Sequence, residues 1–352
     1  MAGQFPPIYF YIPQPYWQDN FPDRADENWQ GFGLGIYAWT LQTYLRLKAD
    51  GFPCELVQEF PDAGIVLIHR NALRSHNDTL KPGRNVLLIC LKAELRPYPY
   101  AQLHLVQNPL ETQITTNSYY IPHWTQPGLI PRDPGRGDRV ETIAFFGHEM
   151  NLAPELLHPS WQKHLDTLGL QWQPIINRNH WSDYRHIDPR CHDYSQVDVI
   201  VAVRRFDHHP EIPRHPYLHK PATKLYNAWL AGVPAVLGVE SAYQAERISP
   251  QDYLEVTSFE ETLSALKRLK GDRRLYQAMV NQGKRRAATI HPSATTAKWR
   301  KFLTDIAIPA YYHWCNQSRF SQHLSFQRNA LIFNLERVKQ KILNKVQMTN
   351  DQ

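Results

Sequence analysis

The sequence predicts an α/β protein made of two doubly wound, Rossmann-like domains that face each other across a cleft. Short apolar runs alternate with helical patterns in two successive blocks, and such runs are typical of parallel strands buried on both faces. A segment rich in proline, glycine and charge, residues 130–139, separates the blocks as a linker would. The length of 352 residues also suits two domains. We expect an N-terminal domain over residues 1–135, a C-terminal domain over 140–292 and a helical tail over 293–352.

The first block opens as Rossmann-like domains do, with a strand, a glycine-rich loop and a helix. The strand is Ile8–Ile12, the loop is residues 31–35, and the helical pattern ends near Gly51. The loop reads G-x-G-x-G and not the dinucleotide fingerprint G-x-G-x-x-G, so it is a weak signal. Its glycines either let the backbone approach a ligand or simply form a tight turn. Further apolar runs predict strands over residues 64–69, 85–90 and 102–107.

The second block repeats the alternation. We expect strands over residues 142–147 and 196–203, with a helix over about 159–168 between them. A short edge strand over 253–256 precedes a helix that begins, in the manner of a capping box, at Ser258. The tail has a helical pattern and is basic.

Between these elements lies the most informative stretch, residues 220–238, which reads KPATKLYNAWLAGVPAVLG. Pro221 suits the first turn of a helix, Gly232 ends the helix, and the next strand follows at 235–237. Lys220 and Lys224 stand at the helix start, where free N–H groups already favour anions. The stretch therefore predicts an anion site that a diphosphate would fit.

Residues 220–238 resemble the donor-binding domain of glycosyltransferases of the GT-B type, which have two Rossmann-like domains. The core Lys-Leu-x-Asn-Ala is also similar to the nucleotide-sugar motif of fucosyltransferases. The resemblance implies transfer of a hexose or deoxyhexose from a nucleotide-diphosphate donor to a saccharide or lipid-linked acceptor bound by the first domain. It also implies that the last helices cross back to the first domain. No cofactor is implied.

The expected donor site combines the helix start with neighbouring loops. Arg204, at the end of a predicted strand, would bind phosphate beside Lys224. Asn227, one helical turn beyond Lys224, either binds ribose or phosphate or is an amide at the edge of the core. The resemblance implies that the loop after the next strand also reaches the donor. The predicted donor and phosphate ligands are Lys224, Arg204, Lys220, Asn227, Glu240, Ser241, Tyr243, Gly33 and Gly35.

The catalytic base is expected from strand ends of the first domain, with Glu94 preferred and His69 second. His123 and Trp124 are candidates for the acceptor side. Retaining GT-B families usually carry two glutamates where this chain has His219 and Asn227, which favours inversion. No D-x-D motif lies between predicted strands, so we expect transfer without a metal.

The composition limits the partners and the compartment. A net charge of +6 and a pI near 9.0 suit anionic partners but are too weak to indicate nucleic acid. The four cysteines are scattered, which fits a reducing cytoplasm. The sequence has no signal peptide pattern and no apolar run that would span a bilayer. We expect a cytoplasmic protein, whose basic tail either lies on the inner face of the membrane or is a solvated face of a packing helix.

Other functions stay open at this stage. A nucleotide-sugar 2-epimerase has the same architecture and would act without an acceptor. A non-catalytic module would bind a nucleotide or sugar without turnover. A nucleic-acid binder is the most distant alternative, because the chain has no nucleic-acid motif.

Overall fold

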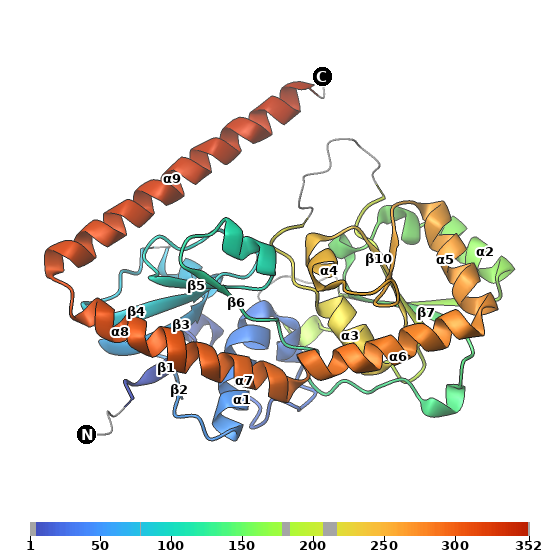
Figure 1. The fold of residues 1–352 in the computed structure, drawn as a ribbon, viewed down its shortest axis with the longest axis horizontal. Helices are drawn as coiled ribbons and strands as arrows, with labels where there is room; N and C mark the ends of the chain where they lie inside the picture. Colours follow the sequence, from blue (N-terminus) through green and yellow to red (C-terminus); the bar gives the residue numbers. More distant parts are fainter. Residues whose placement is uncertain (1–4, 78, 178–183, 207–216, 351–352) are drawn as a thin grey trace.

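The computed structural model describes residues 5–77, 79–177, 184–206 and 217–350, with the side chains of these residues up to 335. The chain folds into two α/β domains that lie side by side (Figure 1). His208, His209 and His215, which the sequence places in a loop after Arg205, lie outside the described residues.

The N-terminal sheet is entirely parallel, with the strand order β2-β1-β3-β4-β5-β6. The strands are β1 (Ile8–Tyr11), β2 (Glu55–Val57), β3 (Ala63–His69), β4 (Asn85–Leu91), β5 (Leu103–Val106) and β6 (Ser118–Tyr120). The strands β3 and β4 are buried along almost their whole length because both faces of the sheet are covered.

The C-terminal sheet is also parallel, with the order β11-β10-β9-β7-β8. Its strands are β7 (Thr142–His148), β8 (Gln171–Asn177), β9 (Val199–Ala202), β10 (Ala235–Gly238) and β11 (Leu254–Val256). In each sheet the chain places its next strand on one side of the first strand and the later strands on the other side. This change of side, the topological switch point, lies between β1 and β3 in the first sheet and between β7 and β9 in the second. Ligands of open α/β sheets collect outside the carboxyl ends of strands at such switch points. The predicted pair of doubly wound domains, the GT-B architecture, is confirmed.

Helices cover the sheets and connect the two domains (Figure 1). They are α1 (Gln42–Ala49), α2 (Pro159–Thr167), α3 (Thr223–Ala231), α4 (Ser241–Glu246), α5 (Phe259–Gly271), α6 (Arg273–Ile290), α7 (Pro292–Phe302), α8 (Ile308–Cys315) and α9 (Arg319–Asn350). The helix α6 packs on α3 in the second domain, whereas α7 packs on α1 and α8 on β4 in the first. None of the helices in the described part of the chain combines the length and apolar character that a membrane crossing needs.

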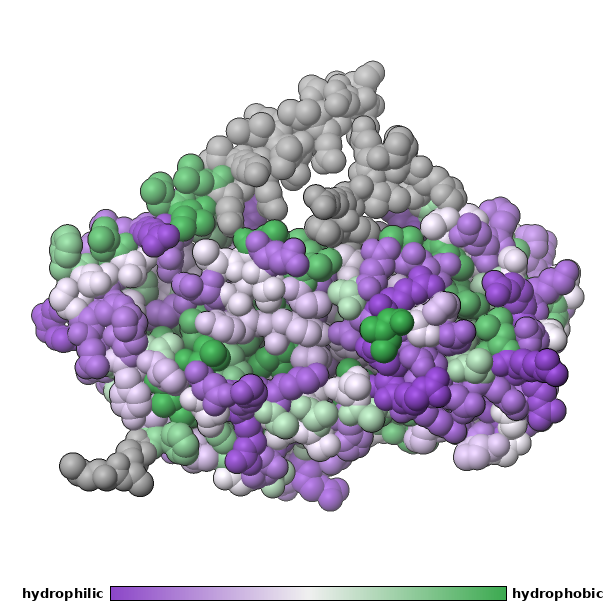
Figure 2. Space-filling view, in the orientation of Figure 1, coloured by the Kyte–Doolittle hydropathy of each residue, from purple (hydrophilic) through white to green (hydrophobic). Residues whose placement is uncertain are grey.

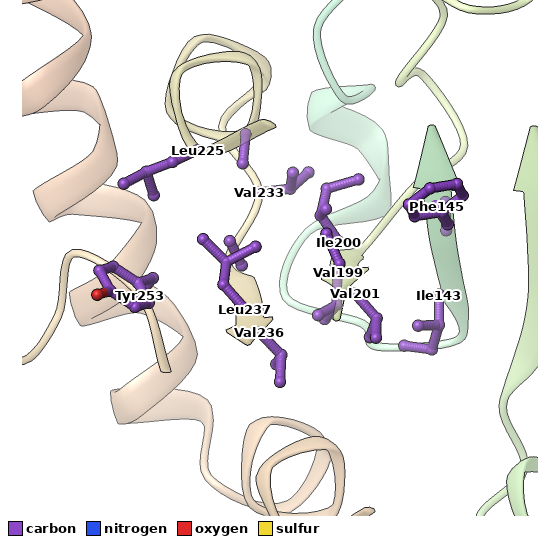
Figure 3. Close-up of a cluster of buried hydrophobic side chains, with 14 of the residues drawn as sticks. Ile143, Phe145, Val199, Ile200, Val201, Leu225, Val233, Val236, Leu237 and Tyr253 are labelled. Carbon is purple, nitrogen blue, oxygen red and sulfur yellow. The ribbon is translucent and has the colours of Figure 1, made fainter. Parts of the chain in front are cut away.

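The core of the second domain holds α3 firmly against the sheet (Figure 3). Leu225 of α3 and Val233 of the following turn lie over the side chains of the central strands. These side chains include Ile143, Phe145, Val199, Ile200, Val201, Val236 and Leu237. Gly232 ends α3 with a φ of 72°, a left-handed conformation that glycine adopts without strain. The N-terminus of α3 is therefore fixed by packing.

Some elements differ from the sequence-based expectation. The strand β8 was not predicted because it contains Pro174, which is tolerated since β8 is an edge strand. The short strands β2 and β6 were not predicted because neither appears in the sequence as an apolar run. The helix after the glycine loop begins at Gly35, as predicted, but it contains a π-helical turn at Tyr37–Leu41 before α1, and the loop itself includes a 3₁₀ turn at Gln30–Gly33.

The segment expected to be a linker is anchored to the second domain by a buried carboxylate. Asp198 accepts hydrogen bonds from Arg132 and Arg136 at 2.7 Å and from the backbone N–H groups of Glu141 and Thr142. Burial alone would raise the pKa of Asp198, but these donors, led by Arg136, outweigh it and hold the pKa below its usual value. The resulting stability is present above the usual carboxyl pKa and is lost as the pH falls below it.

Replacing Asp198 with alanine should lower the free energy of unfolding by about 3 kcal/mol or more, because two nearly buried guanidinium groups lose their carboxylate. Urea unfolding at neutral pH measures the change. As a control, Asp305→Ala removes a surface partner of Lys301 and should leave the midpoint almost unchanged. Equal midpoints for the two variants would show that the ion-pair cluster of Arg132, Arg136 and Asp198 is not needed for stability.

Candidate functional site

A cavity of about 260 Å³ lies between the two domains at the carboxyl end of β7. The first domain contributes residues 32–35 and 123–127 to its wall, and the second contributes residues 146–148, Lys224 and Asn227, among others. Of the residues predicted to bind the donor, Gly33, Gly35, Lys224 and Asn227 line this cavity. The cavity lies at the switch point of the second sheet, where the fold favours ligand binding.

Lys224 faces the cavity, and its amino group is paired with no acidic side chain in the described part of the chain. It stands in the first turn of α3, and its Nζ lies 5.5 Å from the ring centre of Phe145. Within the described residues, no hydrogen bond or ion pair joins this ammonium group to an acceptor. Burial, followed by repulsion from Arg204, lowers the pKa of Lys224 to about 7. The free N–H groups of the α3 N-terminus lie beside it, so the site is suited to an anion.

Gly147 lets the backbone approach this anion site closely. Its φ of 150° is one that residues with a side chain rarely adopt. A side-chain carbon at this position would lie 3.4 Å from Cε and 3.5 Å from Nζ of Lys224. Sequence reasoning placed Gly147 at a strand end but gave it no role. The available signal was a glycine at the carboxyl end of the first strand of the domain.

Two histidines of the first domain lie close together with opposite tautomers. Nδ1 of His123, a residue of the cavity wall, lies 2.9 Å from the carbonyl oxygen of Trp124. Because a carbonyl only accepts, Nδ1 carries the proton and Nε2 has the free lone pair. Nδ1 of His69 instead accepts from the backbone N–H of Asn71 at 3.2 Å, so the neutral ring carries its proton on Nε2. A side-chain carbon at Gly35 would lie 3.4 Å from this Nε2.

Burial lowers the pKa of both histidines, that of His69 to about 3. Both rings are therefore neutral near pH 7. In His69 the only lone pair is already used by a backbone donor, whereas His123 presents a lone pair on a cavity-lining ring. The geometry thus favours His123 over His69 as a proton acceptor.

Arg204 does not line the cavity but lies next to it. Its guanidinium donates to Glu240 at 2.7 Å and to Asn151, which is part of the cavity wall. Burial opposes the charge of Arg204, but Glu240 outweighs this effect and the pKa is raised. Glu240 and Tyr243 are buried behind Arg204. A direct phosphate contact by Arg204 stays a prediction, as does donor binding by Glu240 and Tyr243.

Other predicted residues form contacts between the domains. Lys220 pairs with Glu94, the first-choice base, so the two neutralise each other across the interface. The oxygen of the Asn227 side chain accepts from the backbone N–H of Gln126 at 2.9 Å. Ser241 accepts from Asn108 at 3.0 Å in a buried contact. These contacts join the domains around the cavity, and the predicted ligand roles of these residues are not tested by them.

Sequence reasoning missed a buried charged cluster at the same interface. Lys92 and Glu111 form a fully buried ion pair, and Nδ1 of His219 lies 2.7 Å from Glu111 and 3.1 Å from Lys92. Beside it, Tyr120 and Tyr226 both donate to Glu246 at 2.7 Å. No local pattern marks these residues, because the partners are more than a hundred positions apart in most pairs.

Within the described ranges, no group of three or more His, Cys, Asp or Glu side chains is placed to hold a metal ion. The expected metal independence of the reaction stays a prediction.

Nitrogen-15 NMR of labelled histidines should find the proton of neutral His69 on Nε2 and that of neutral His123 on Nδ1. Because burial lowers both pKa values, neither ring should become protonated between about pH 6.5 and 8. His123→Gln assigns the second signal. A proton on Nε2 of His123 at pH 7 would remove the lone pair that the site presents.

No family model matches this chain, and no curated protein matches its sequence. Solved structures with a similar fold include sucrose-phosphate synthase from Thermosynechococcus elongatus, at 10% identity over 76% of each chain with a TM-score of 0.45. HepE from Anabaena, solved with UDP, is 11% identical over 85% of this chain and 100% of its own, with a TM-score of 0.46. TarM from S. aureus is 8% identical over 79% of this chain and 60% of its own, with a TM-score of 0.45. Similarity at this distance does not identify the activity of the chain.

Proposed function

We propose that this protein is a glycosyltransferase that moves a hexose or deoxyhexose from a nucleoside-diphosphate sugar to a saccharide or lipid-linked acceptor. The observation that carries the proposal is Lys224 at the start of α3, whose amino group faces a cavity between the two domains and has no paired acceptor among the described residues. The motif of residues 220–238, which resembles nucleotide-sugar binding segments, supports the same reading.

The diphosphate of the donor binds at the N-terminus of α3 in this proposal. Lys224 neutralises the negative charge that grows on the diphosphate as the bond to the sugar breaks, and the helix N–H groups add hydrogen bonds. Gly147 leaves room for the phosphate beside Lys224. The anion restores the charge of Lys224, because a nearby negative charge raises a lysine pKa that burial has lowered. With this positive charge supplied by the protein, transfer proceeds without a divalent metal.

His123 is the base of the reaction in this proposal, in place of Glu94 and His69. Its Nε2 takes the proton of the acceptor hydroxyl while the hydroxyl oxygen attacks the anomeric carbon. The bond between that carbon and the phosphate oxygen breaks, and the electron pair leaves with the diphosphate. Attack opposite to the leaving group inverts the configuration. His123 lines the cavity from the first domain and Lys224 from the second. This supports a pose in which the acceptor approaches the sugar from the side opposite to the leaving group.

Lys224→Ala should reduce turnover about 100-fold or more, the scale of losing one group that stabilises developing charge. Lys224→Arg keeps the positive charge and should lose much less turnover than Lys224→Ala. Turnover is measured with UDP-, GDP-, CDP- and dTDP-sugars in the presence of EDTA, after a thermal-shift panel of the four diphosphates identifies the nucleotide. Lys267→Ala, on the surface of α5, is the matched control. Normal turnover of Lys224→Ala would refute the leaving-group role of Lys224.

His123→Gln should lower turnover about 10²- to 10⁴-fold, because a glutamine fills a similar space but cannot take the proton. The thermal shift produced by the nucleoside diphosphate should be unchanged. Glu94→Gln, which breaks only the pair with Lys220, should have a much smaller effect. If Glu94→Gln loses activity and His123→Gln does not, the base is Glu94. Conversion of the donor without acceptor would indicate the 2-epimerase reaction instead.

A further inference from the structure

One side of α9 attaches the helix to the N-terminal domain. The side chain of Gln322 donates to the carbonyl oxygens of Trp314 at 2.8 Å and Arg84 at 3.2 Å. The ring of Phe326 lies 5.2 Å from that of Trp314 and 5.9 Å from that of Tyr100. These contacts fix which side of the helix faces the domain, while the rest of α9 extends away from the body (Figure 1).

The opposite side of α9 carries a stripe of exposed large apolar residues. The exposed fractions are 76% for Phe320, 54% for Leu324, 61% for Leu331 and 61% for Leu335. At 3.6 residues per turn, these four residues lie within about 60° of the helix circumference. Phe326 points from the other side of the same helix. In Figure 2, hydrophobic surface lies beside the grey atoms where the described part of α9 leaves the body. Such a stripe is costly in water unless a partner covers it.

The charge of the helix indicates the kind of partner. Residues 319–350 contain six Lys and Arg residues and a single acidic residue, Glu336. In the described part of the helix, Arg328 lies about 20° from the edge of the exposed stripe, whereas Arg319 lies near the side that carries Phe326. A second copy of α9 would bring two strongly basic segments together, which opposes pairing. An anionic surface offers both the opposite charge and an apolar layer for the stripe.

We propose that α9 lies in the plane of an anionic membrane surface, with Phe320, Leu324, Leu331 and Leu335 inserted between the lipid headgroups. A helix with an apolar stripe beside basic side chains binds membranes in this way. The contact does not depend on the proposed glycosyltransferase activity. If both are correct, the cavity between the domains is held near the membrane, which suits a lipid-linked acceptor.

Co-sedimentation of the full-length protein with vesicles tests the proposal. The vesicles consist of phosphatidylcholine alone or with phosphatidylglycerol. The protein should bind the vesicles that contain phosphatidylglycerol and bind far less to phosphatidylcholine alone. Leu324→Glu combined with Leu331→Glu should weaken binding at least tenfold, because two apolar side chains no longer enter the lipid. Arg328→Gln should weaken it about fivefold. Thermal melting shows whether the variants are folded.

A matched control removes exposed apolar residues elsewhere on the surface. Ile248 and Met150 are exposed by 74% and 65%, and Ile248→Glu combined with Met150→Glu should bind vesicles like the unchanged protein. Equal binding to both kinds of vesicle would overturn the proposal. The same holds if the control variant loses as much vesicle binding as Leu324→Glu with Leu331→Glu. A dimer in light scattering that Leu324→Glu with Leu331→Glu converts to a monomer, combined with no vesicle binding, would also overturn it. That result would assign the stripe to a second copy of the chain.

Discussion

Charging a partly buried lysine that has no paired carboxylate costs free energy, and the described part of the chain offers Lys224 no such partner. The packing of α3 against the second sheet fixes the helix start, which places Lys224 at the cavity wall. Its neighbours Arg204 and Lys220 have acidic partners, Glu240 and Glu94, whereas Lys224 has none among the described residues. The lowered pKa of Lys224 expresses the cost of this arrangement. An anionic ligand at the helix start would remove that cost.

The polar contacts between the domains keep the two walls of the cavity together. Asn108 with Ser241, Gln126 with Asn227, and the cluster of Lys92, Glu111 and His219 all cross the interface. Such contacts add little net stability, because each polar group must first lose water. They do require particular partners, however, so they favour one relative position of the domains. In that position His123 of the first domain and Lys224 of the second line the same cavity, as the proposed group transfer requires.

The features that could be predicted from the sequence are those that depend on residues close to one another along the chain. The strands β3 and β4 could be predicted because buried parallel strands appear as continuous apolar runs. The helix containing Lys224 could be predicted from Pro221, its terminal glycine and the strand that follows, although the helix begins at Thr223, so that Pro221 precedes it and does not stand in its first turn. The strand β8 was missed because Pro174 is acceptable only at a sheet edge, and the position of a strand in a sheet is not a local property.

The sequence alone does not single out the base, for a similar reason. Glu94 and His69 are its candidates because His69 ends one predicted strand and Glu94 lies just beyond another. The pairing of Glu94 with Lys220, and the backbone groups that fix the tautomers of His69 and His123, depend on contacts in space. The sequence marks His123 only as a candidate for the acceptor side, with no pattern to indicate that it would present a lone pair to the cavity.

The most direct test of the account is the number of protons taken up when the protein binds its nucleoside diphosphate at pH 8. Calorimetry in buffers of different ionisation enthalpy measures this number. At pH 8 the phosphates are already ionised and Lys224, with a pKa of about 7, is mostly neutral before binding. Binding should take up about one proton per diphosphate, whereas Lys224→Arg should bind the diphosphate without proton uptake. Binding without proton uptake, or with equal uptake in Lys224→Arg, would contradict the claim that Lys224 holds the diphosphate.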